Sequence, residues 1–336
     1  MHQHMMMIYT MTNLANKFRE DPWASIEEDN FPKGKQLYED DERFFVAKRD
    51  GGKLVFWAFE KIDKVPEIKL NVPELKIEYD NIDESTKRLI ITFEEIHQSI
   101  NEQLAIVVKD VAIHSSAYKG TEFFSEIINR FGSWSEFLKP SRRGLSEREL
   151  IGLWGEMYLL LKYFFKEYTQ SQAITAWVGP ERKKQDFTFN DFALEIKTTL
   201  SENSSRIKIA SLEQLEKITP KLFLVHIFLN KCSPDDGWNL KKLYQEILKK
   251  IGEDISVKGN FLRKVSKLLN RATEEQEEMS FNYLDMNIYE VEDNFPGFIA
   301  SEELHPAIVK ASYELDPNKL SNFIINRSLE TILKDG

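Results

Sequence analysis

Residues 185–198 read Gln-Asp-Phe-Thr-Phe-Asn-Asp-Phe-Ala-Leu-Glu-Ile-Lys-Thr. Two short aromatic and β-branched runs flank the pair Asn190-Asp191, and a turn-prone pair between two such runs predicts a β-hairpin. With these two residues as the turn, Asp186 pairs with Glu195 across the hairpin. We therefore expect two carboxylates to face each other on neighbouring strands.

The same register separates apolar from polar side chains, because successive side chains of a strand alternate between the two faces of a sheet. The apolar face then carries Phe187, which pairs with Leu194, together with Phe189, Phe192 and Ile196. The other face carries Asp186, Thr188, Ala193, Glu195 and Lys197. The simple alternative is an amphipathic hairpin whose polar face lies in water.

Two like charges directly opposite each other destabilise a sheet, so the facing carboxylates need a compensating cation. Mg²⁺ prefers oxygen ligands and is commonly bound by one or two carboxylates plus a substrate phosphate, and Mn²⁺ suits the same ligands. Lys197 would lie beside them, where its ammonium can orient an attacking water and offset charge on a phosphate. The hairpin thus predicts a metal site with Asp186 and Glu195 as ligands and Lys197 as a catalytic residue.

Residues 146–168 predict a long helix that begins with a capping box, because Ser146 is followed three residues later by Glu149. Apolar residues follow at helical spacing, so we expect this helix to be buried over much of its circumference. Glu156 lies among them, and a carboxylate in apolar surroundings is costly unless it is paired or metal-bound. The alternative is a surface glutamate on a helix with a few exposed leucines.

Further elements follow in an informative order. Residues 173–178 predict a strand, the hairpin supplies two more, a capped helix is predicted to begin at Ser211, and residues 222–229 predict a buried strand. This order resembles the core of the PD-(D/E)XK nuclease superfamily, the restriction-endonuclease-like fold. The motifs that carry the resemblance are Gly152-Leu-Trp-Gly-Glu156, Trp177-Val-Gly-Pro180, Gln185-Asp186-Phe187, Glu195-Ile-Lys197-Thr-Thr199 and Ser211-Leu-Glu-Gln214-Leu215.

The resemblance covers roughly residues 141–231. This part of the sequence is similar to one bacterial family, called PD-(D/E)XK motif proteins, which is associated with restriction-modification and phage-defence gene clusters. The sequence departs from the family name at one point, because Gln185 stands where Pro is expected. The resemblance implies an α/β fold (mixed α+β) with an αβββαβ core and a mixed central sheet. It also implies a Mg²⁺-dependent endonuclease (Mn²⁺ as substitute) that acts on DNA, as a homodimer or with other restriction or defence subunits.

The resemblance extends the predicted site by three residues. Glu156 would join Asp186 and Glu195 at the metal, the main-chain carbonyl of Ile196 would add an oxygen ligand, and Gln214 would line the site. The spacing of Ser211 and Gln214 also fits a capping box, which accounts for both residues without a function.

Several cations near this core are candidates for DNA contacts, because lysine and arginine clusters bind nucleic-acid backbones. They are Lys183 and Lys184, preceded by Arg182, then Arg206 and Lys208 on a short predicted strand, and Arg142 and Arg143 before the first helix. We add Gln214 to the DNA-binding set. The alternative for each cation is an ordinary solvated side chain.

Composition sets the outer limits. The chain has 336 residues, 42% of them hydrophobic, which indicates a globular protein with more than one domain. A net charge of -10 argues against a protein that coats DNA indiscriminately, although a local cationic groove remains compatible with it. The single cysteine, Cys232, permits no intrachain disulfide and fits a reducing cytoplasm. We expect no membrane span.

Three segments are predicted: an accessory β-rich domain at 1–140, the nuclease core at 141–232 and an α/β extension at 233–336. The first contains a hairpin at 43–59, strands at 75–79 and 88–93, and helices near 93–104 and 122–138. The last contains helices at 239–251 and 257–275, strands at 283–291 and 308–315, and a helix at 317–333. The runner-up function is a catalytically silent nuclease-fold module for DNA binding or assembly.

Overall fold

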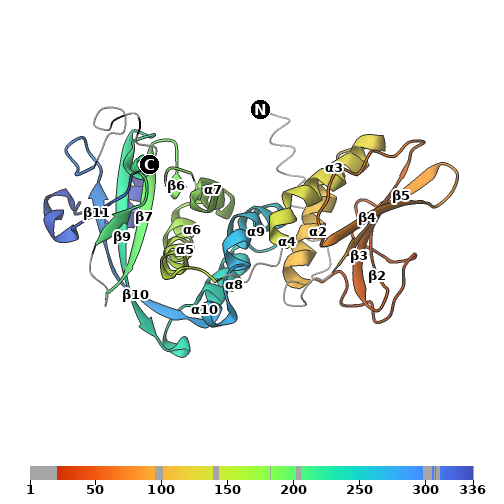
Figure 1. The fold of residues 1–336 in the computed structure, drawn as a ribbon, viewed down its shortest axis with the longest axis horizontal. Coiled ribbons are helices and arrows are strands. Elements are labelled where there is room, and N and C mark those ends of the chain that lie inside the picture. The colour runs from red at the N-terminus through yellow and green to blue at the C-terminus, as the bar shows by residue number, and fades with distance from the viewer. Residues whose placement is uncertain are drawn as a thin grey trace. The chain divides into compact units, whose positions relative to one another are not determined.

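The computed structural model describes residues 21–94, 101–138, 144–181, 183–201, 206–297, 305, 307 and 311–335. The chain forms two compact units, the first from residues 1–140 and 253–266 and the second from residues 141–252 and 267–336. Each unit contains its own β-sheet (Figure 1). The division into three segments at residues 140 and 232 stays a prediction.

The sheet of unit 1 is built from the predicted hairpin and two further predicted strands. Its order is β1-β2-β3-β5-β4, and all neighbours are antiparallel. The hairpin turn places Asp50, Gly51 and Gly52 at positive φ, which explains the two glycines there. The elements of unit 1 are β1 (Lys35–Gln36), β2 (Phe44–Arg49), β3 (Lys53–Lys61), β4 (Leu75–Asn81), β5 (Thr86–Phe93), α2 (Asn101–Ser115), α3 (Gly120–Ser133), α4 (Ser135–Leu138) and most of α9 (Ile255–Leu269).

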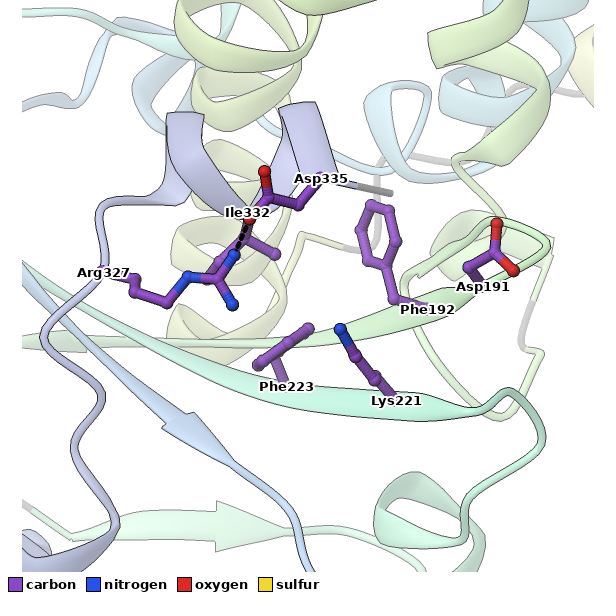
Figure 2. Close-up of a pocket in the computed structure, with 7 residues that line it drawn as sticks. All are labelled: Asp191, Phe192, Lys221, Phe223, Arg327, Ile332 and Asp335. Carbon is purple, nitrogen blue, oxygen red and sulfur yellow. Dashed lines mark hydrogen bonds and ion pairs between the residues drawn. The ribbon is translucent and has the colours of Figure 1, made fainter.

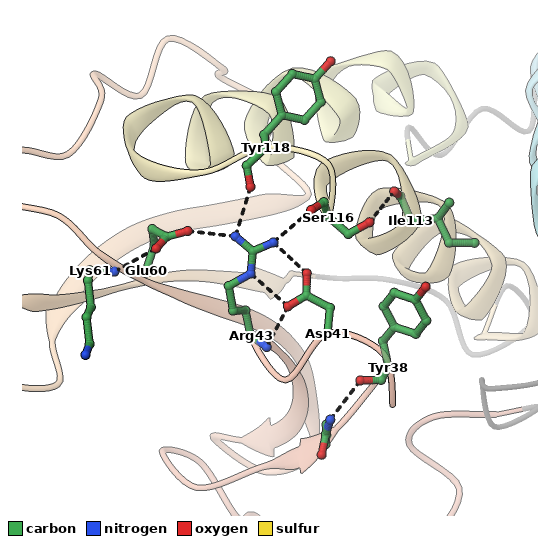
Figure 3. Close-up of polar contacts among 9 residues, drawn as sticks. Tyr38, Asp41, Arg43, Glu60, Lys61, Ile113, Ser116 and Tyr118 are labelled. Carbon is green, nitrogen blue, oxygen red and sulfur yellow. Dashed lines mark hydrogen bonds and ion pairs between the residues drawn. The ribbon is translucent and has the colours of Figure 1, made fainter. Parts of the chain in front are cut away.

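A bidentate arginine ties the sheet of unit 1 to its helices (Figure 3). The Arg43 guanidinium donates to Asp41 at 2.6 Å and to Glu60 at 2.8 Å, and it also donates to the carbonyl oxygens of Tyr118 at 3.0 Å and Ser116 at 3.1 Å. It lies 3.9 Å from the centre of the Phe123 ring. One side chain therefore provides hydrogen-bond donors for two carbonyl groups in the turn between α2 and α3, and it fixes this turn against β2 and β3.

A second polar cluster lies inside the helical layer of unit 1, around Asp110 of α2. Asp110 is only 4% exposed, and it accepts two hydrogen bonds from Arg130 at 2.7 Å and one from Trp134 at 2.9 Å. Arg263 of α9 adds a contact at 3.3 Å. The carboxylate thus joins α2 and α3 to a helix that comes from much later in the sequence.

The sheet of unit 2 is mixed, as predicted, with the order β10-β9-β7-β6. The strands β7 and β9 are parallel, whereas the outer pairs are antiparallel. The hairpin register is confirmed, because Phe187 pairs with Leu194. The principal elements of unit 2 are α5 (Glu147–Leu159), the π-helical turn η3 (Leu160–Phe164), α6 (Phe165–Glu167), α7 (Gln170–Ala176), β6 (Phe187–Thr188), β7 (Phe192–Leu200), β8 (Ile207–Ile209), η5 (Leu212–Leu215), β9 (Lys221–Cys232), α8 (Leu240–Ile251), α10 (Glu274–Glu278), β10 (Ser280–Glu290), β11 (Tyr313–Leu315) and α12 (Leu329–Asp335).

Both faces of this sheet are covered. Figure 1 shows α5 and α6 on one side of β7 and β9, and β11 on the other. The helix side receives the predicted apolar face, where Phe187 stacks on Phe164 at a centroid distance of 4.2 Å. On the other side Ala193 lies in an apolar cluster with Ile207 and Ile209 of β8. The face that carries Glu195 is therefore largely buried.

The predicted start of the core helix is also confirmed. Ser146 caps α5, and its side chain and that of Glu149 form the reciprocal capping box. Burial of Leu153, Trp154 and Met157 agrees with the expected apolar surroundings of Glu156.

Two details of the αβββαβ order are wrong, although the α/β class holds. The predicted strand at 173–178 is the helix α7, which Thr169 and Gln172 cap, and only an isolated bridge joins Trp177 to Phe187. The predicted helix at Ser211 is the single 3₁₀ turn η5, and the Ser211 side chain makes no cap.

A further error lies outside that core, in the C-terminal part of the chain. The predicted helix at 317–333 is two 3₁₀ turns, Pro317–Lys319 and Ser321–Phe323, followed by α12. Of the predicted strand at 308–315, residues 313–315 form β11, residues 311–312 are not in a strand, and residues 308–310 lie outside the described residues. In unit 1, Phe93 ends β5, whereas a helix was predicted to begin near it, and residues 95–100 of that prediction lie outside the described residues.

A buried histidine makes the stability of unit 2 sensitive to acid. His226 of β9 is 0% exposed, and burial lowers its pKa from 6.5 to about 4. The unfolded chain binds this proton first as the pH falls, so up to about 3 kcal/mol of stability is present above pH 6.5 and is lost as the pH falls toward 4. Urea unfolding at neutral and acidic pH measures this loss. His226→Gln keeps a partner for Thr199 but does not titrate, so equal acid sensitivity in the variant would contradict the assignment.

Candidate active site

The four residues of the predicted site gather at the edge of the sheet where β6 begins. β6 has two residues, which pair with Leu194 and Ala193 of β7. Asp186 lies directly before these two residues, and its side chain continues the pairing with β7. Its Oδ2 accepts a hydrogen bond from the backbone N–H of Ile196 at 2.7 Å. Asp186 is therefore fixed against the strand that carries Glu195 and Lys197.

Glu195 and Lys197 are neighbours on one face of β7. The Lys197 ammonium lies 2.6 Å from Glu195 Oε1, and the Glu195 side chain is 1% exposed. Glu195 Oε2 is buried and has no hydrogen-bond partner among the residues that the structure describes. Burial and then the charge of Asp186 raise the pKa of Glu195 to about 8, although Lys197 opposes the shift.

Glu156 reaches the same place from α5, which packs on the sheet with Gly155 against Thr198. Its Oε2 accepts a hydrogen bond from the Trp177 indole at 2.7 Å. Burial and the negative charge of Asp186 raise the pKa of Glu156 well above its usual value, and Glu195 adds to the shift. The pKa of Asp186 is also raised by burial, although Lys197 opposes this.

Gly179 shows how closely two of these carboxylates approach. A Cβ placed on Gly179 would lie 2.5 Å from Glu156 Oε2 and 2.6 Å from Asp186 Oδ1. The two oxygens thus converge on a point that only a glycine leaves open. The residue begins the 3₁₀ turn Gly179–Glu181, two residues after the Trp177 that holds Glu156.

These residues fit a divalent cation. Within the described part of the chain no three His, Cys, Asp or Glu side chains enclose a metal position by themselves. Mg²⁺ does not require such a cage, because it is commonly bound by one or two carboxylates plus water and substrate phosphate. The buried partnerless oxygen of Glu195 and the convergent oxygens of Asp186 and Glu156 supply that donor set, and a bound dication would compensate the charge that raises their pKa values.

The backbone of Ile196 is oriented as the resemblance implies. The N–H and C=O groups of one strand residue point to the same side. Because the Ile196 N–H is directed at Asp186, its carbonyl oxygen points toward the same edge. Its role as a metal ligand stays a prediction.

Gln214 lies next to the site and contacts it through a hydrogen bond with Lys197. Its Oε1 accepts hydrogen bonds from the Lys197 ammonium at 3.1 Å and from the backbone N–H of Ala210 at 2.8 Å. The capping explanation for Gln214 is therefore wrong, because the turn at Ser211 has no side-chain cap. A DNA contact by Gln214 stays a prediction.

The candidate DNA-binding cations lie at the surface. Lys183 is exposed, and Lys184 pairs with Glu216 at 2.8 Å. Arg206 is 69% exposed beside Glu314, which lies opposite Lys208 in the β8–β11 pair. Their DNA contacts stay predictions, and Arg142, Arg143 and Arg182 lie outside the described residues.

Sequence reasoning missed three residues that shape the site. Trp177 holds Glu156, Gly179 leaves room for two carboxylates, and Gln185 is almost fully buried behind Asp186. Trp177 and Gly179 stand in one of the quoted motifs, but nothing in their spacing predicts that they surround Glu156. Gln185 is a polar residue between a basic loop and a strand, and that pattern gives no signal of burial.

A pocket elsewhere in unit 2 does not belong to this site (Figure 2). It lies between the beginnings of β7 and β9 and the helix α12, and Arg327 and Asp335 form an ion pair at its wall. Its lining residues are Asp191, Phe192, Lys221, Phe223, Arg327, Ile332 and Asp335. None of the predicted catalytic residues is among them.

Substituting Gly179 tests the convergence of the two carboxylates. We expect Gly179→Ala to lower metal affinity about 10- to 100-fold, as loss of supporting contacts at metal sites does, because the new methyl group displaces Glu156 or Asp186. Isothermal titration calorimetry with Mn²⁺ measures this. Gly152→Ala on α5 is the control: nothing lies within 4 Å of its Cβ, so it should leave metal affinity unchanged and raise helix stability by about 1 kcal/mol. Equal affinity of the two variants would refute the convergence.

The mixed sheet, the acid directly before β6 and the Glu-x-Lys on β7 define a restriction-endonuclease-like protein of the PD-(D/E)XK class. The sequence model of a family described as "Putative PD-(D/E)XK family member" (DUF4420) matches residues 20–317. The chain belongs to this family. Searches of curated proteins and of solved structures found no match.

The family match extends beyond the core that the resemblance covered and includes unit 1. The accessory segment is thus part of the family's shared sequence. In the portions of the chain that the structure describes, every helix is too short or too polar to span a bilayer.

Proposed function

We propose that this protein is a Mg²⁺-dependent DNA endonuclease and the nuclease component of a bacterial restriction or phage-defence system. The observation that supports it best is the gathering of Asp186, Glu195 and Glu156 beside the Lys197 ammonium at one sheet edge. Glu195 is buried and the other two acids are half-buried, and all three have raised pKa values. Such a set is costly to the fold unless it serves binding or chemistry.

Each residue has a distinct role in this proposal. Asp186, Glu195 and Glu156 would hold the cation, with the Ile196 carbonyl as a further ligand. The chemistry that Mg²⁺ supplies when bound is stabilisation of charge on the phosphate and a lower pKa for a coordinated water. The Lys197 ammonium would orient the attacking water, and hydrolysis would proceed in line without a covalent enzyme intermediate. Trp177 keeps Glu156 directed at the site.

The substrate side of the proposal follows from the family. A nuclease of this class acts on DNA, and Lys183, Lys184, Arg206 and Lys208 would contact its phosphates. Cutting both strands of a duplex usually needs two active sites, so we propose a homodimer or a complex with other restriction or defence subunits. A cytoplasmic location, favoured by the lone Cys232, belongs to the same proposal.

A plasmid-nicking assay tests the proposal. Supercoiled DNA incubated with the purified protein should be nicked or linearised with Mg²⁺ or Mn²⁺ and should stay intact with EDTA. Tight DNA binding without cleavage under any metal would favour the alternative, a catalytically silent nuclease-fold module for DNA binding or assembly. The raised pKa values of three neighbouring acids disfavour that alternative, because a silent module gains nothing from keeping them.

A further inference from the structure

Gln185 is a deeply buried polar residue next to the proposed catalytic set. It is 1% exposed and directly precedes Asp186. Its side-chain N–H group lies within hydrogen-bond distance of three carbonyl oxygens: Glu213 at 3.1 Å, Gln214 at 3.4 Å and Glu216 at 2.9 Å. An amide nitrogen carries two hydrogens, so all three carbonyls share one donor group.

Those carbonyls belong to η5 and the residue that follows it. A single 3₁₀ turn has poor hydrogen-bond geometry and leaves terminal backbone groups without partners. η5 also lacks a side-chain cap at Ser211. Gln185 therefore donates hydrogen bonds that help to hold this turn in place. It also connects the turn to Asp186, the next residue in the chain.

The turn in turn holds the lysine. Gln214 is in η5, and its Oε1 accepts from the Ala210 backbone and from the Lys197 ammonium. Among the residues that the structure describes, the other partner of this ammonium is Glu195. A lysine side chain is long and loses considerable rotamer entropy when it is fixed, so a defined orientation needs more than one acceptor.

We propose that Gln185 and Gln214 form a positioning relay that sets the orientation of the Lys197 amine. Gln214 is the direct acceptor, and Gln185 acts only through the turn. The relay rests on the proposed function, since it gives Lys197 its place in the reaction. It also gives a physical role to the residue that stands where the family name has proline, because proline has no side-chain donor for the turn.

The first test measures the lysine and does not need cleavage. Acylation of Lys197 by an N-hydroxysuccinimide ester is followed by peptide mass spectrometry in the metal-free full chain. Gln185→Leu and Gln214→Leu should each raise the acylation rate of Lys197 about fivefold, the factor that corresponds to one net hydrogen bond. Gln214→Glu retains the acceptor oxygen and adds a charge that favours the ammonium, so it should label no faster than the wild type.

Gln276 provides a matched control in the same unit. Its side chain also pins backbone, since it accepts from the Leu145 N–H at 2.8 Å and donates to the Leu145 carbonyl at 2.6 Å. Gln276→Leu should lower thermal stability but leave Lys197 acylation unchanged. An equal rise in Lys197 acylation in this variant would show a general loosening of the unit and would overturn the relay.

The second test separates positioning from binding. If the wild-type protein cleaves the plasmid, Gln185→Leu and Gln214→Leu should each lower kcat about 10- to 100-fold and leave KM for the plasmid unchanged. This is the result expected for loss of a supporting contact. A change confined to KM would overturn the relay. If Gln185→Leu does not fold, the pair Gln214→Leu and Gln214→Glu decides alone. If wild type does not cleave, the proposed function fails, whereas the acylation result still decides the relay.

Discussion

Lys197→Ala is expected to cut DNA about 10²–10³-fold more slowly than wild type, because the ammonium that would orient water and offset phosphate charge is lost. Asp186→Ala should lose at least as much, since Asp186 Oδ1 is one of the two oxygens that converge beside Gly179. Rates of plasmid nicking at saturating Mg²⁺ measure both. Fold should survive, because each side chain lies at the sheet edge, and circular dichroism checks this.

Asp191 provides the matched control for the acid. It lies in the turn of the same hairpin and is exposed. Asp191→Ala should therefore cut at the wild-type rate. Equal cleavage by Lys197→Ala, Asp186→Ala and Asp191→Ala would remove the site assignment, whatever the fold.

Asp110→Ala is expected to destabilise unit 1 by about 3–5 kcal/mol, the usual cost of removing one partner from a buried charge cluster. The substitution leaves Arg130 and Arg263 without their shared carboxylate and removes the acceptor of the Trp134 indole. Urea unfolding followed by tryptophan fluorescence measures the change, because the Trp134 side chain is in the cluster.

The surface pair Lys76–Glu78 sets the scale for comparison. Its two side chains are 53% and 32% exposed, so Lys76→Ala should cost less than about 1 kcal/mol. A similar small loss for Asp110→Ala would mean that the buried cluster contributes no more than an ordinary surface ion pair.

Local patterns predicted the parts of the fold that local interactions determine. The hairpin register follows from a two-residue turn between alternating runs, and the start of α5 follows from the Ser146 and Glu149 capping box. This register places Asp186 opposite Glu195. It therefore predicts that the two acids lie at one edge of the sheet, without information from the rest of the chain. Glu156 needed the resemblance, because its helix reaches that edge only through tertiary packing.

The errors arose where distant residues decide the structure or where a local signal was overlooked. Thr169 and Gln172 form a capping box that predicts α7, but the β-branched and aromatic residues after it suggested a strand. The turn η5 is held by Gln185, which is far away in sequence, so the spacing around Ser211 suggested a longer helix. Burial of the Glu195 face depends on β8 and on β11, which lies more distant still.

The return of α9 to unit 1 has a consequence for biosynthesis. Arg263, which completes the Asp110 cluster, is translated only after α5, β7, β9 and α8 of unit 2 have been made. Domains ordinarily fold on the ribosome in the order in which they are translated. Here unit 1 cannot complete its folding before unit 2 is translated. A nascent chain that stops before residue 253 leaves unit 1 without α9.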